Sequence, residues 1–471
     1  MQGLKSKVLK GGIYLTLRQL VSNVLSIVSV LVIARVLGPE NYGIVAIALG
    51  IFYFLSWTTK VGLPIYLVRQ SNLDGDAPKA VLSFFNTAGV MFCVVLWLCA
   101  PLLGWWTNRA EVTDVVHWLP LPLWFDMVAS VSIAMLEREL KFAEVGLIET
   151  VAQISNYLLS IPLVLLGWGY WGPIAGIILQ FSLLSAIATY YYPIPWRLQL
   201  EWKILKPALQ FGIGYSGSSW LLNLKALTVP LVISRLAGVE AAGIAGFSIR
   251  FVEQLSILRW VIKRMSISVL ARLSGNLDAI RSTITKGMAY QALLIGPVCA
   301  VFSCFSAWII PLLFGEKWLP SIYLFPLVAI ATLVNSVFDM HSSALYAAGH
   351  NRDVAKQNAA YILLLWLSCS LLLPRFGVWG YGLAELVALP SFVLIHTSLT
   401  KLYGSPNYHV VVWLILATLP PLFAGAFFPQ GWGFAALAIS YGLLLLCNRA
   451  VRSIPIELYS TWRSKKQVSA T

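Results

Sequence analysis

Long apolar stretches follow one another along almost the whole chain, separated by short polar or glycine-rich breaks. Because about 20 apolar residues in a helix cross about 30 Å of hydrocarbon, each stretch predicts one transmembrane helix. The stretches are continuously apolar and not alternating, which favours a helical bundle over a membrane barrel. The pattern predicts 14 spans, at 12–35, 41–67, 81–104, 118–136, 145–167, 172–192, 207–234, 241–262, 288–314, 321–347, 356–374, 379–400, 409–428 and 431–448.

The chain also contains an internal repeat. Residues 32–44 align with residues 232–244 without a gap, and seven of these 13 pairs are identical. The identities include an Arg, two Gly and a Glu, which a generic apolar helix would not supply: Arg35/Arg235, Gly38/Gly238, Glu40/Glu240 and Gly43/Gly243. Pro-Leu-Leu recurs at 101–103 and 311–313, and Gly-x-Trp-Gly recurs at 169–172 and 377–380. Self-similarity at a long, nearly fixed spacing indicates a duplication.

The duplication organises the predicted helices into two lobes of six. An even number of crossings returns the chain to the same side of the membrane, so the lobes share one orientation and are related by a pseudo-twofold axis along the membrane normal. We therefore expect an all-α polytopic membrane protein with an N-terminal lobe at 1–200 and a C-terminal lobe at 201–403. Two further helices and a basic tail occupy 404–471. Duplicated hydrophobic chains of this kind are typical of transporters whose site lies between the halves.

Composition and charge agree with this interpretation. The chain is 59% hydrophobic and 11% charged, whereas soluble domains are about 25% charged. Its net charge of +14 could indicate a nucleic-acid partner, but Lys and Arg fall mostly on the side that holds the N-terminus. The opposite loops hold Arg35, Arg109, Arg235, Lys317 and Arg375. The positive-inside rule then predicts that both termini are cytoplasmic, and the basic balance reflects topology.

The repeated motif has a structural interpretation. Gly38 can end one helix and Pro39 can open the next, and a cation in a last turn, such as Arg35, suits the helix dipole. We therefore expect the Arg/Gly/Glu/Gly motif to act mainly as a pair of helix ends.

Polar residues inside the spans are the candidate functional groups, because charges at membrane depth are costly and usually face a cavity or a partner. Embedded cations predominate, which suits a diphosphate or an acidic sugar. Arg250 and Glu253 can pair at i, i+3, Lys60 can snorkel to a membrane surface, and Asn23 and Asn223 can instead join helices. The candidate cavity residues are Arg18, Asn23, Asp126, Asn223, Lys225, Arg250, Glu253 and Asp339.

Motifs for chemistry are missing from the sequence. It has no phosphate-binding loop of the GxxxxGK[ST] type and no HExxH. Its five histidines are scattered, and its six cysteines lie in apolar spans without CxxC spacing. The sequence therefore predicts no catalytic residue, no metal and no cofactor, and a protein that is not an enzyme.

Residues 34–43, A-R-V-L-G-P-E-N-Y-G, resemble the A-R-x-L-G-P-x-x-Y-G opening of bacterial Wzx-like polysaccharide flippases, in the multidrug/oligosaccharidyl-lipid/polysaccharide exporter superfamily. Residues 137–142, E-R-E-L-K-F, are similar to the R-x-L-x-F segment of its colanic-acid-exporter-like branch. The resemblance implies alternating-access transport of oligosaccharide units linked to undecaprenyl diphosphate across the cytoplasmic membrane, for exopolysaccharide, O-antigen or capsule synthesis. The implied partners are this lipid-linked substrate, membrane lipid and other polysaccharide-assembly proteins, with no nucleic acid.

Three other functions compete with this one. A drug or cation antiporter of the same superfamily fits poorly with few embedded acids and many embedded cations. An O-antigen polymerase or ligase would carry a long extracytoplasmic loop, and no outer loop here is long. A lipid II flippase remains a third alternative, against which the L-G-P-E-N-Y-G opening favours the exopolysaccharide branch.

The charge asymmetry makes a testable prediction about topology. Single cysteines placed at Arg281 and Lys465 should react with thiol reagents from the cytoplasmic side only, because both belong to the basic side of the protein. Labelling of either position by an impermeant reagent added to intact cells would contradict the predicted helix count.

Overall fold

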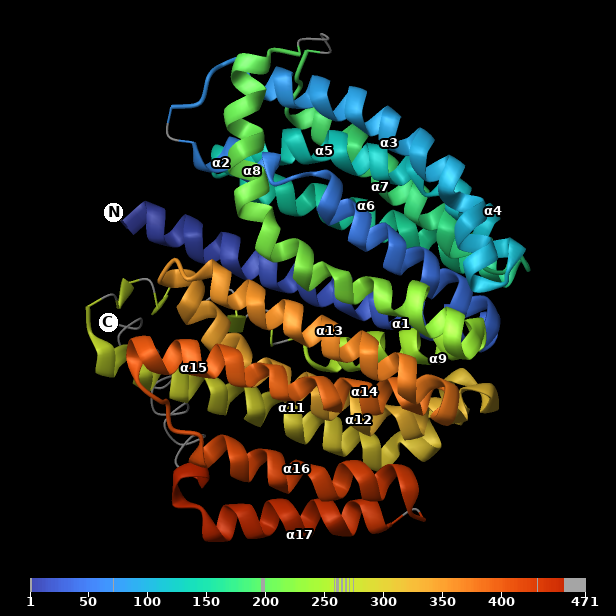
Figure 1. The fold of residues 1–471 in the computed structure, drawn as a ribbon, viewed down its shortest axis with the longest axis vertical. Helices are drawn as coiled ribbons and strands as arrows, with labels where there is room; N and C mark the ends of the chain where they lie inside the picture. Colours follow the sequence, from blue (N-terminus) through green and yellow to red (C-terminus); the bar gives the residue numbers. More distant parts are fainter. Residues whose placement is uncertain are drawn as a thin grey trace. The chain divides into compact units, whose positions relative to one another are not determined.

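The computed structural model describes residues 2–452, apart from positions 71, 196–199, 258, 260, 261, 264, 265, 267, 268, 271, 274 and 430; the side chains of 2–24, 215, 218, 219 and 222 are also outside the description. The described residues form helices and connecting loops (Figure 1). Eleven of these helices are long and apolar enough to cross a membrane, and Trp432–Cys447 is a shorter apolar helix. Each of the 14 predicted spans falls on helical segments, so the prediction of an all-α polytopic membrane protein is confirmed.

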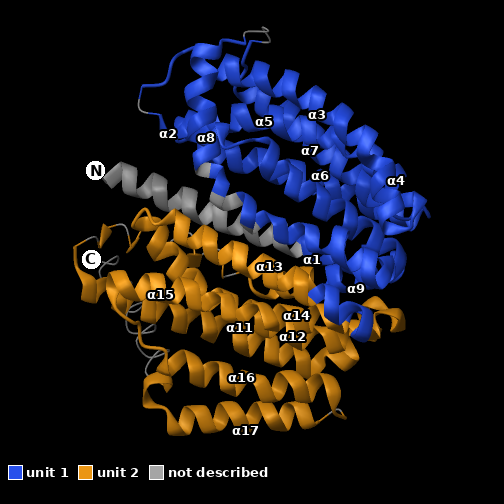
Figure 2. Ribbon diagram, viewed as in Figure 1, with its two compact units in different colours: residues 1–247, 369–378 blue, residues 248–368, 379–471 orange. Residues whose placement is uncertain are grey.

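The chain packs as two compact units, shown in two colours in Figure 2. Unit 1 comprises Met1–Phe247 and Cys369–Val378, and unit 2 comprises Ser248–Ser368 and Trp379–Thr471. The opening of the second repeat therefore packs with unit 1. The division at 200 and 403 follows the sequence repeat and not packing, and it stays a prediction.

Unit 1 holds the helices of the first repeat and the beginning of the second. In chain order they are α1 (Gln2–Thr59), α2 (Leu63–Arg69), α3 (Ala77–Thr107), α4 (Ala110–Trp118), α5 (Pro120–Arg138), α6 (Phe142–Leu165), α7 (Trp171–Tyr191), α8 (Trp202–Asn223), η1 (Leu224–Leu227), η2 (Thr228–Ile233) and the first part of α9 (Ser234–Leu255).

Unit 2 holds the remaining helices. They are α11 (Leu277–Phe314), η3 (Glu316–Trp318), α12 (Leu319–Ala347), most of α13 (Asn351–Phe376), α14 (Trp379–Ala388), η4 (Leu389–Ser391), α15 (Phe392–Tyr403), α16 (His409–Phe427) and α17 (Trp432–Cys447). The two C-terminal helices lie side by side (Figure 1), and α16 packs on α11, where the buried Ser303 hydroxyl donates to the Leu422 carbonyl at 2.6 Å.

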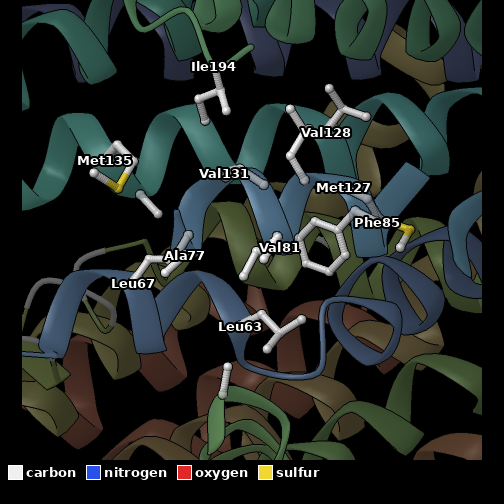
Figure 3. Packing of buried hydrophobic residues seen from close by; sticks show 14 of the residues in the cluster. Leu63, Leu67, Ala77, Val81, Phe85, Met127, Val128, Val131, Met135 and Ile194 are labelled. Carbon is white, nitrogen blue, oxygen red and sulfur yellow. The ribbon is translucent and has the colours of Figure 1, made fainter. Parts of the chain in front are cut away.

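An apolar core joins α2, α3 and α5 of unit 1 (Figure 3). Leu63 and Leu67 on α2 meet Val81 and Phe85 on α3, and all four side chains are fully buried. Val131 on α5 completes this layer. Because α2 follows directly on the end of α1, the core also fixes the turn between them, which carries the charged residue described below.

The repeated motif ends helices in both copies, as predicted. The backbone leaves the helical region at Gly38, with φ +66°, and at Gly238, with φ +89°. A positive φ of this kind favours glycine because it lacks a Cβ atom. The identical glycines therefore mark the same bend in each repeat.

A second pair of repeated glycines brings the two copies into contact inside unit 1. A Cβ atom at Gly43 would lie 2.0 Å from the carbonyl oxygen of Val239, and one at Gly243 would lie 1.9 Å from that of Pro39. Each glycine thus packs on the residue one position after the bend in the other copy. A reciprocal contact of this kind is what a local twofold axis produces.

Four predicted spans are not continuous helices among the described residues. The span 207–234 passes from α8 into a 3-10 turn at Leu224–Leu227 and a π-helix at Thr228–Ile233, which contains Pro230. The span 41–67 breaks at Lys60–Gly62, the span 379–400 contains the 3-10 turn Leu389–Ser391, and the span 241–262 leaves the helix after Leu255. The expectation of unbroken helices was wrong at these places, because hydropathy reports which segments are apolar and not their hydrogen-bond pattern.

Candidate functional site

The turn between α1 and α2 places Lys60 at the edge of the core. Val61 has φ +46° and Gly62 has φ +67°, and a β-branched residue rarely adopts a positive φ. The backbone of α8 packs tightly against this turn, since a Cβ atom at Gly212 would lie 1.9 Å from the Val61 carbonyl oxygen. The strained turn is thus held between α8 and the α2 core.

Lys60 reaches from this turn to Asp126 on α5. Its Nζ atom lies 2.8 Å from each carboxylate oxygen of Asp126, and the hydroxyl of Ser56 on α1 donates to the same carboxylate. Asp126 is 5% exposed, whereas the Lys60 side chain is 25% exposed. The first repeat therefore contains a buried carboxylate neutralised by a cation from the turn between α1 and α2. We call Ser56, Lys60 and Asp126 the first-repeat charge cluster.

The second repeat contains a corresponding cluster in unit 2. The Nε atom of Arg259 and the Nζ atom of Lys263 both donate to the carboxylate of Asp339 on α12, the Lys263 contact at 2.8 Å. Asp339 is as buried as Asp126. We call Arg259, Lys263 and Asp339 the second-repeat charge cluster.

The two charge clusters occupy corresponding helices. Asp126 and Asp339 lie on the fourth predicted helix of their repeats, and the cations lie at the end of the second. Ser56 aligns with the buried Ser256 in the gap-free part of the repeat. The first cluster pairs one cation with one carboxylate, and the second pairs two cations with one carboxylate.

The candidate residues from the sequence are divided between the units. Arg18 and Asn23 lie on α1, but their side chains are outside the described residues. Asn223 and Lys225 are half-buried at the junction of α8 and η1, where the helix leaves α geometry. Such departures inside a helix are common at hinges and functional sites.

Arg250 and Glu253 lie on α9 in unit 2. They pair at i, i+3 as expected, with 3.9 Å between their closest charged atoms, but the Glu253 side chain is 52% exposed. The Arg250–Glu253 ion pair is therefore long and partly exposed. The eight candidates as a set remain a prediction of a binding cavity.

One expectation about a cation is corrected by the structure. Lys60 does not snorkel away from the protein interior, because its ammonium is held by Asp126. Lys263 lies just after the predicted span 241–262; it is 19% exposed and bonded to Asp339. The partners lie 66 and 76 residues away in the sequence, so spacing along one helix could not reveal either pair.

A second polar cluster in unit 2 surrounds Glu385 on α14. The phenols of Tyr361 on α13 and Tyr381 on α14 both donate to its carboxylate. The amide of Asn335 on α12 donates to the Tyr361 oxygen at 3.4 Å. Glu385 and its phenol partners are not among the candidate residues from the sequence, because tyrosines resemble ordinary residues of an apolar span.

Two of the histidines that appear scattered in the sequence converge on one tyrosine. His341 Nε2 lies 2.6 Å and His396 Nδ1 lies 2.8 Å from the hydroxyl of Tyr408, just before α16. Burial raises the pKa of Tyr408 above its usual value, so the phenol stays protonated and can donate to only one of them. Among the described residues, no three His, Cys, Asp or Glu side chains converge as metal ligands would.

Comparison with known proteins gives this geometry a context. Residues 32–323 match the model of a family described as polysaccharide biosynthesis protein. This match covers well over half of the chain, including both copies of the repeated motif.

The relatives of this chain are named for polysaccharide biosynthesis and transport. The chain is 22% identical over 354 residues to the lipopolysaccharide biosynthesis protein WzxC of Escherichia coli K12, covering 73% of this chain and 70% of the relative. It is 24% identical over 322 residues to the succinoglycan biosynthesis transport protein ExoT of Rhizobium meliloti, covering 66% and 63%. These are transport and biosynthesis proteins of surface polysaccharides, in agreement with the prediction of a transporter and not an enzyme.

Solved structures show the same fold. A lipid II flippase MurJ in an inward closed conformation aligns with a TM-score of 0.71 at 12% identity, over 94% of this chain and 98% of that one. A multidrug resistance transporter of the MATE family, inward-facing, aligns with a TM-score of 0.63 at 14% identity, over 81% and 95%. At these identities the likeness concerns the fold alone.

The first-repeat charge cluster makes a prediction about stability. Lys60→Met should lower the free energy of unfolding by about 3 kcal/mol, because it leaves the Asp126 carboxylate buried without its cation. Lys60→Met/Asp126→Leu should recover most of this loss, since it removes both charges. Thermal unfolding of the purified variants in detergent measures the difference. Equal losses in the single and the double variant would show that the pair does not hold the turn to α5.

Proposed function

Because this chain belongs to the polysaccharide biosynthesis protein family, we propose that it moves lipid-linked oligosaccharide units from the cytoplasmic to the outer leaflet of the bacterial cytoplasmic membrane. The family match over residues 32–323 is the observation that carries this proposal. Relatives named for lipopolysaccharide biosynthesis and succinoglycan transport support it. The products served would be exopolysaccharide, O-antigen or capsule, with other assembly proteins of that synthesis as partners.

The proposed carrier is undecaprenyl diphosphate. Embedded cations such as Lys225 suit a diphosphate, which arginine and lysine bind through charge-assisted hydrogen bonds. The polyprenyl tail would stay in the bilayer during transport, because transferring it into a polar cavity loses about 0.8 kcal/mol for each CH₂ group. The substrate would therefore enter and leave through a lateral opening.

The charge clusters argue against the alternative of a cationic-drug antiporter. Such a transporter needs embedded carboxylates that can neutralise its substrate. Asp126 is already neutralised by Lys60, and Asp339 by Arg259 and Lys263. The structural likeness to a multidrug transporter therefore extends to the fold and not to this chemistry.

The proposed mechanism is alternating access, in which the duplicated halves rock about a central site. The reciprocal contact of Gly43 and Gly243 in unit 1 supports it, because that contact brings the bends of both repeats together. The charge distribution supports the proposal that these bends lie on the extracytoplasmic side and both termini in the cytoplasm. Opening toward the outside would then require the two bends to separate.

The export prediction tests the function itself. In cells that lack their own flippase for one polysaccharide, the chain should restore its export, and Lys225→Met should lower export about tenfold, the effect of losing one charge-assisted hydrogen bond worth about 1.5 kcal/mol. Polysaccharide is measured at the cell surface, and protein level by immunoblot. Lys317→Met, in an outer loop, is the matched control and should export normally. If export by Lys225→Met falls only in proportion to its protein level, Lys225 has a structural role and does not bind the substrate.

The rocking prediction uses the position three residues before each bend. Cysteines at Arg35 and Arg235, in a chain whose six native cysteines are replaced by Ala, should arrest export when joined by a short cleavable cross-linker, because the bends could no longer separate. Reduction of the cross-linker should restore export. Full export through the cross-linked protein would rule out this motion.

A further inference from the structure

Glu385 is an acid buried at membrane depth in unit 2. It is 1% exposed, and its phenol partners Tyr361 and Tyr381 are 6% and 1% exposed. A carboxylate in such surroundings is costly unless it is hydrogen-bonded or neutralised. Two phenol donors stabilise the charged form without carrying a charge themselves. The site can therefore hold the acid in either protonation state.

The hydroxyl groups of this cluster allow a proton to be taken up without moving heavy atoms. In the charged form, Glu385 accepts from both phenols. With one proton bound to a carboxyl oxygen, it can instead donate to the oxygen of one phenol, because a phenol both donates and accepts. If that phenol is Tyr361, its own proton must turn elsewhere, and its bond from Asn335 on α12 is affected as well.

The cluster also adjoins the second-repeat charge cluster. Asn335 and Asp339 are spaced i, i+4 on α12 and share one face of that helix. Asn335, which donates to the Tyr361 oxygen, therefore lies on the same face of α12 as the carboxylate of the second-repeat charge cluster.

The other titratable groups on the helices around Glu385 already have partners. Asp339 is held by Arg259 and Lys263. On the same helix, His341 bonds to Tyr408, and so does His396 of α15. These groups form their own contacts, and the phenol-bound Glu385 is chemically distinct from them.

The corresponding hairpin of the first repeat carries a polar layer of another kind. Between α6 and α7 the amide of Asn156 donates to Gln180 at 2.7 Å, and the hydroxyl of Ser160 donates to Asn156 at 2.7 Å. Amides and hydroxyls of this kind do not titrate at physiological pH. Gln180 follows Gly169 by 11 residues and Glu385 follows Gly377 by eight, so, counted from the repeated glycine, they occupy equivalent positions of their own helices to within about one helical turn. The α6–α7 hairpin therefore shows that a polar layer at this position does not require an acid.

We propose that Glu385, with Tyr361 and Tyr381, is a proton-binding site that couples transport to the proton gradient. The inference rests on the proposed function for the coupling, while the proton site itself stands on the geometry. One proton binds to the Glu385 carboxylate in one facing state and leaves in the other, and no other bond is made or broken. The first repeat, with its amide layer, does not take part.

Infrared difference spectroscopy of the purified full-length chain tests the proton site without any substrate. Lowering the pH from about 8 to about 5, the range in which buried carboxyls commonly titrate, should produce the carbonyl band of a protonated carboxyl group. Glu385→Gln should abolish that band. Tyr361→Phe keeps the acid and should keep the band but change the pH at which it appears. A spectrum in which Glu385→Gln changes no band would overturn the proposal, whatever the transport result.

Export measurements test the coupling. A protonophore should stop export by the native chain, and Glu385→Gln should lose at least tenfold of its proton-driven export at an unchanged protein level. The matched control is the double variant Glu385→Gln/Gln180→Glu, which moves the acid to the first-repeat layer. Its export should stay as low as that of Glu385→Gln alone. Restored export by the double variant, or export by the native chain that continues in the presence of the protonophore, would overturn the coupling. If the native chain exports nothing while the Glu385 band is present, the proposed function fails and the proton site stands.

Discussion

A charge placed at membrane depth must find a counter-charge or hydrogen-bond partners within the protein, because lipid offers none. In this chain a counter-charge is supplied twice, once in each repeat, where cations from another part of the repeat reach a carboxylate on a helix. In the first repeat much of the local backbone depends on it. The Lys60 ammonium reaches Asp126 from a turn in which Val61 has φ +46°, and the glycine at 212 gives that turn room against α8.

The same constraint shapes what the protein can bind. An embedded acid that already holds a lysine is a poor counter-ion for a cationic drug. Two embedded cations, Arg259 and Lys263, share the one acid Asp339, so that cluster keeps a net positive charge. A net positive cluster agrees with the proposal of an anionic cargo. This conclusion comes from how the charges are partnered, which net charge alone does not reveal.

The sequence predicted the elements well and their partners poorly, for a physical reason. Hydropathy reports which segments lie in lipid, and glycine at a helix end has a local cause, so the spans and the bends at Gly38 and Gly238 were predictable. The contact of Lys60 with Asp126 depends on which helices become neighbours, and no local pattern encodes that. The breaks at Lys60–Gly62 and Leu224–Ile233 were not predicted for a related reason, because the spans around them are apolar enough to read as one continuous stretch. The phenols around Glu385 were missed because tyrosine in a membrane span usually signals an interface and not a bound acid.

Duplication explains why some positions stayed alike in the two repeats and others diverged. At the reciprocal contact in unit 1, Gly43 packs on Val239 and Gly243 packs on Pro39, so a larger side chain in either copy would push against the other. Both copies must therefore keep a glycine there. This steric constraint between the two copies does not apply to the polar layers of the hairpins. The Asn156–Gln180 layer lies wholly inside the first repeat and the Tyr361–Glu385 layer wholly inside the second, so each can change without a clash in the other. An acid could thus arise in one copy while the other kept its amides. The proposed difference between the repeats, with symmetry at the contact and a proton site in the second repeat only, follows from the contacts. Residues that contact their own counterparts must stay alike, and the others are free to differ.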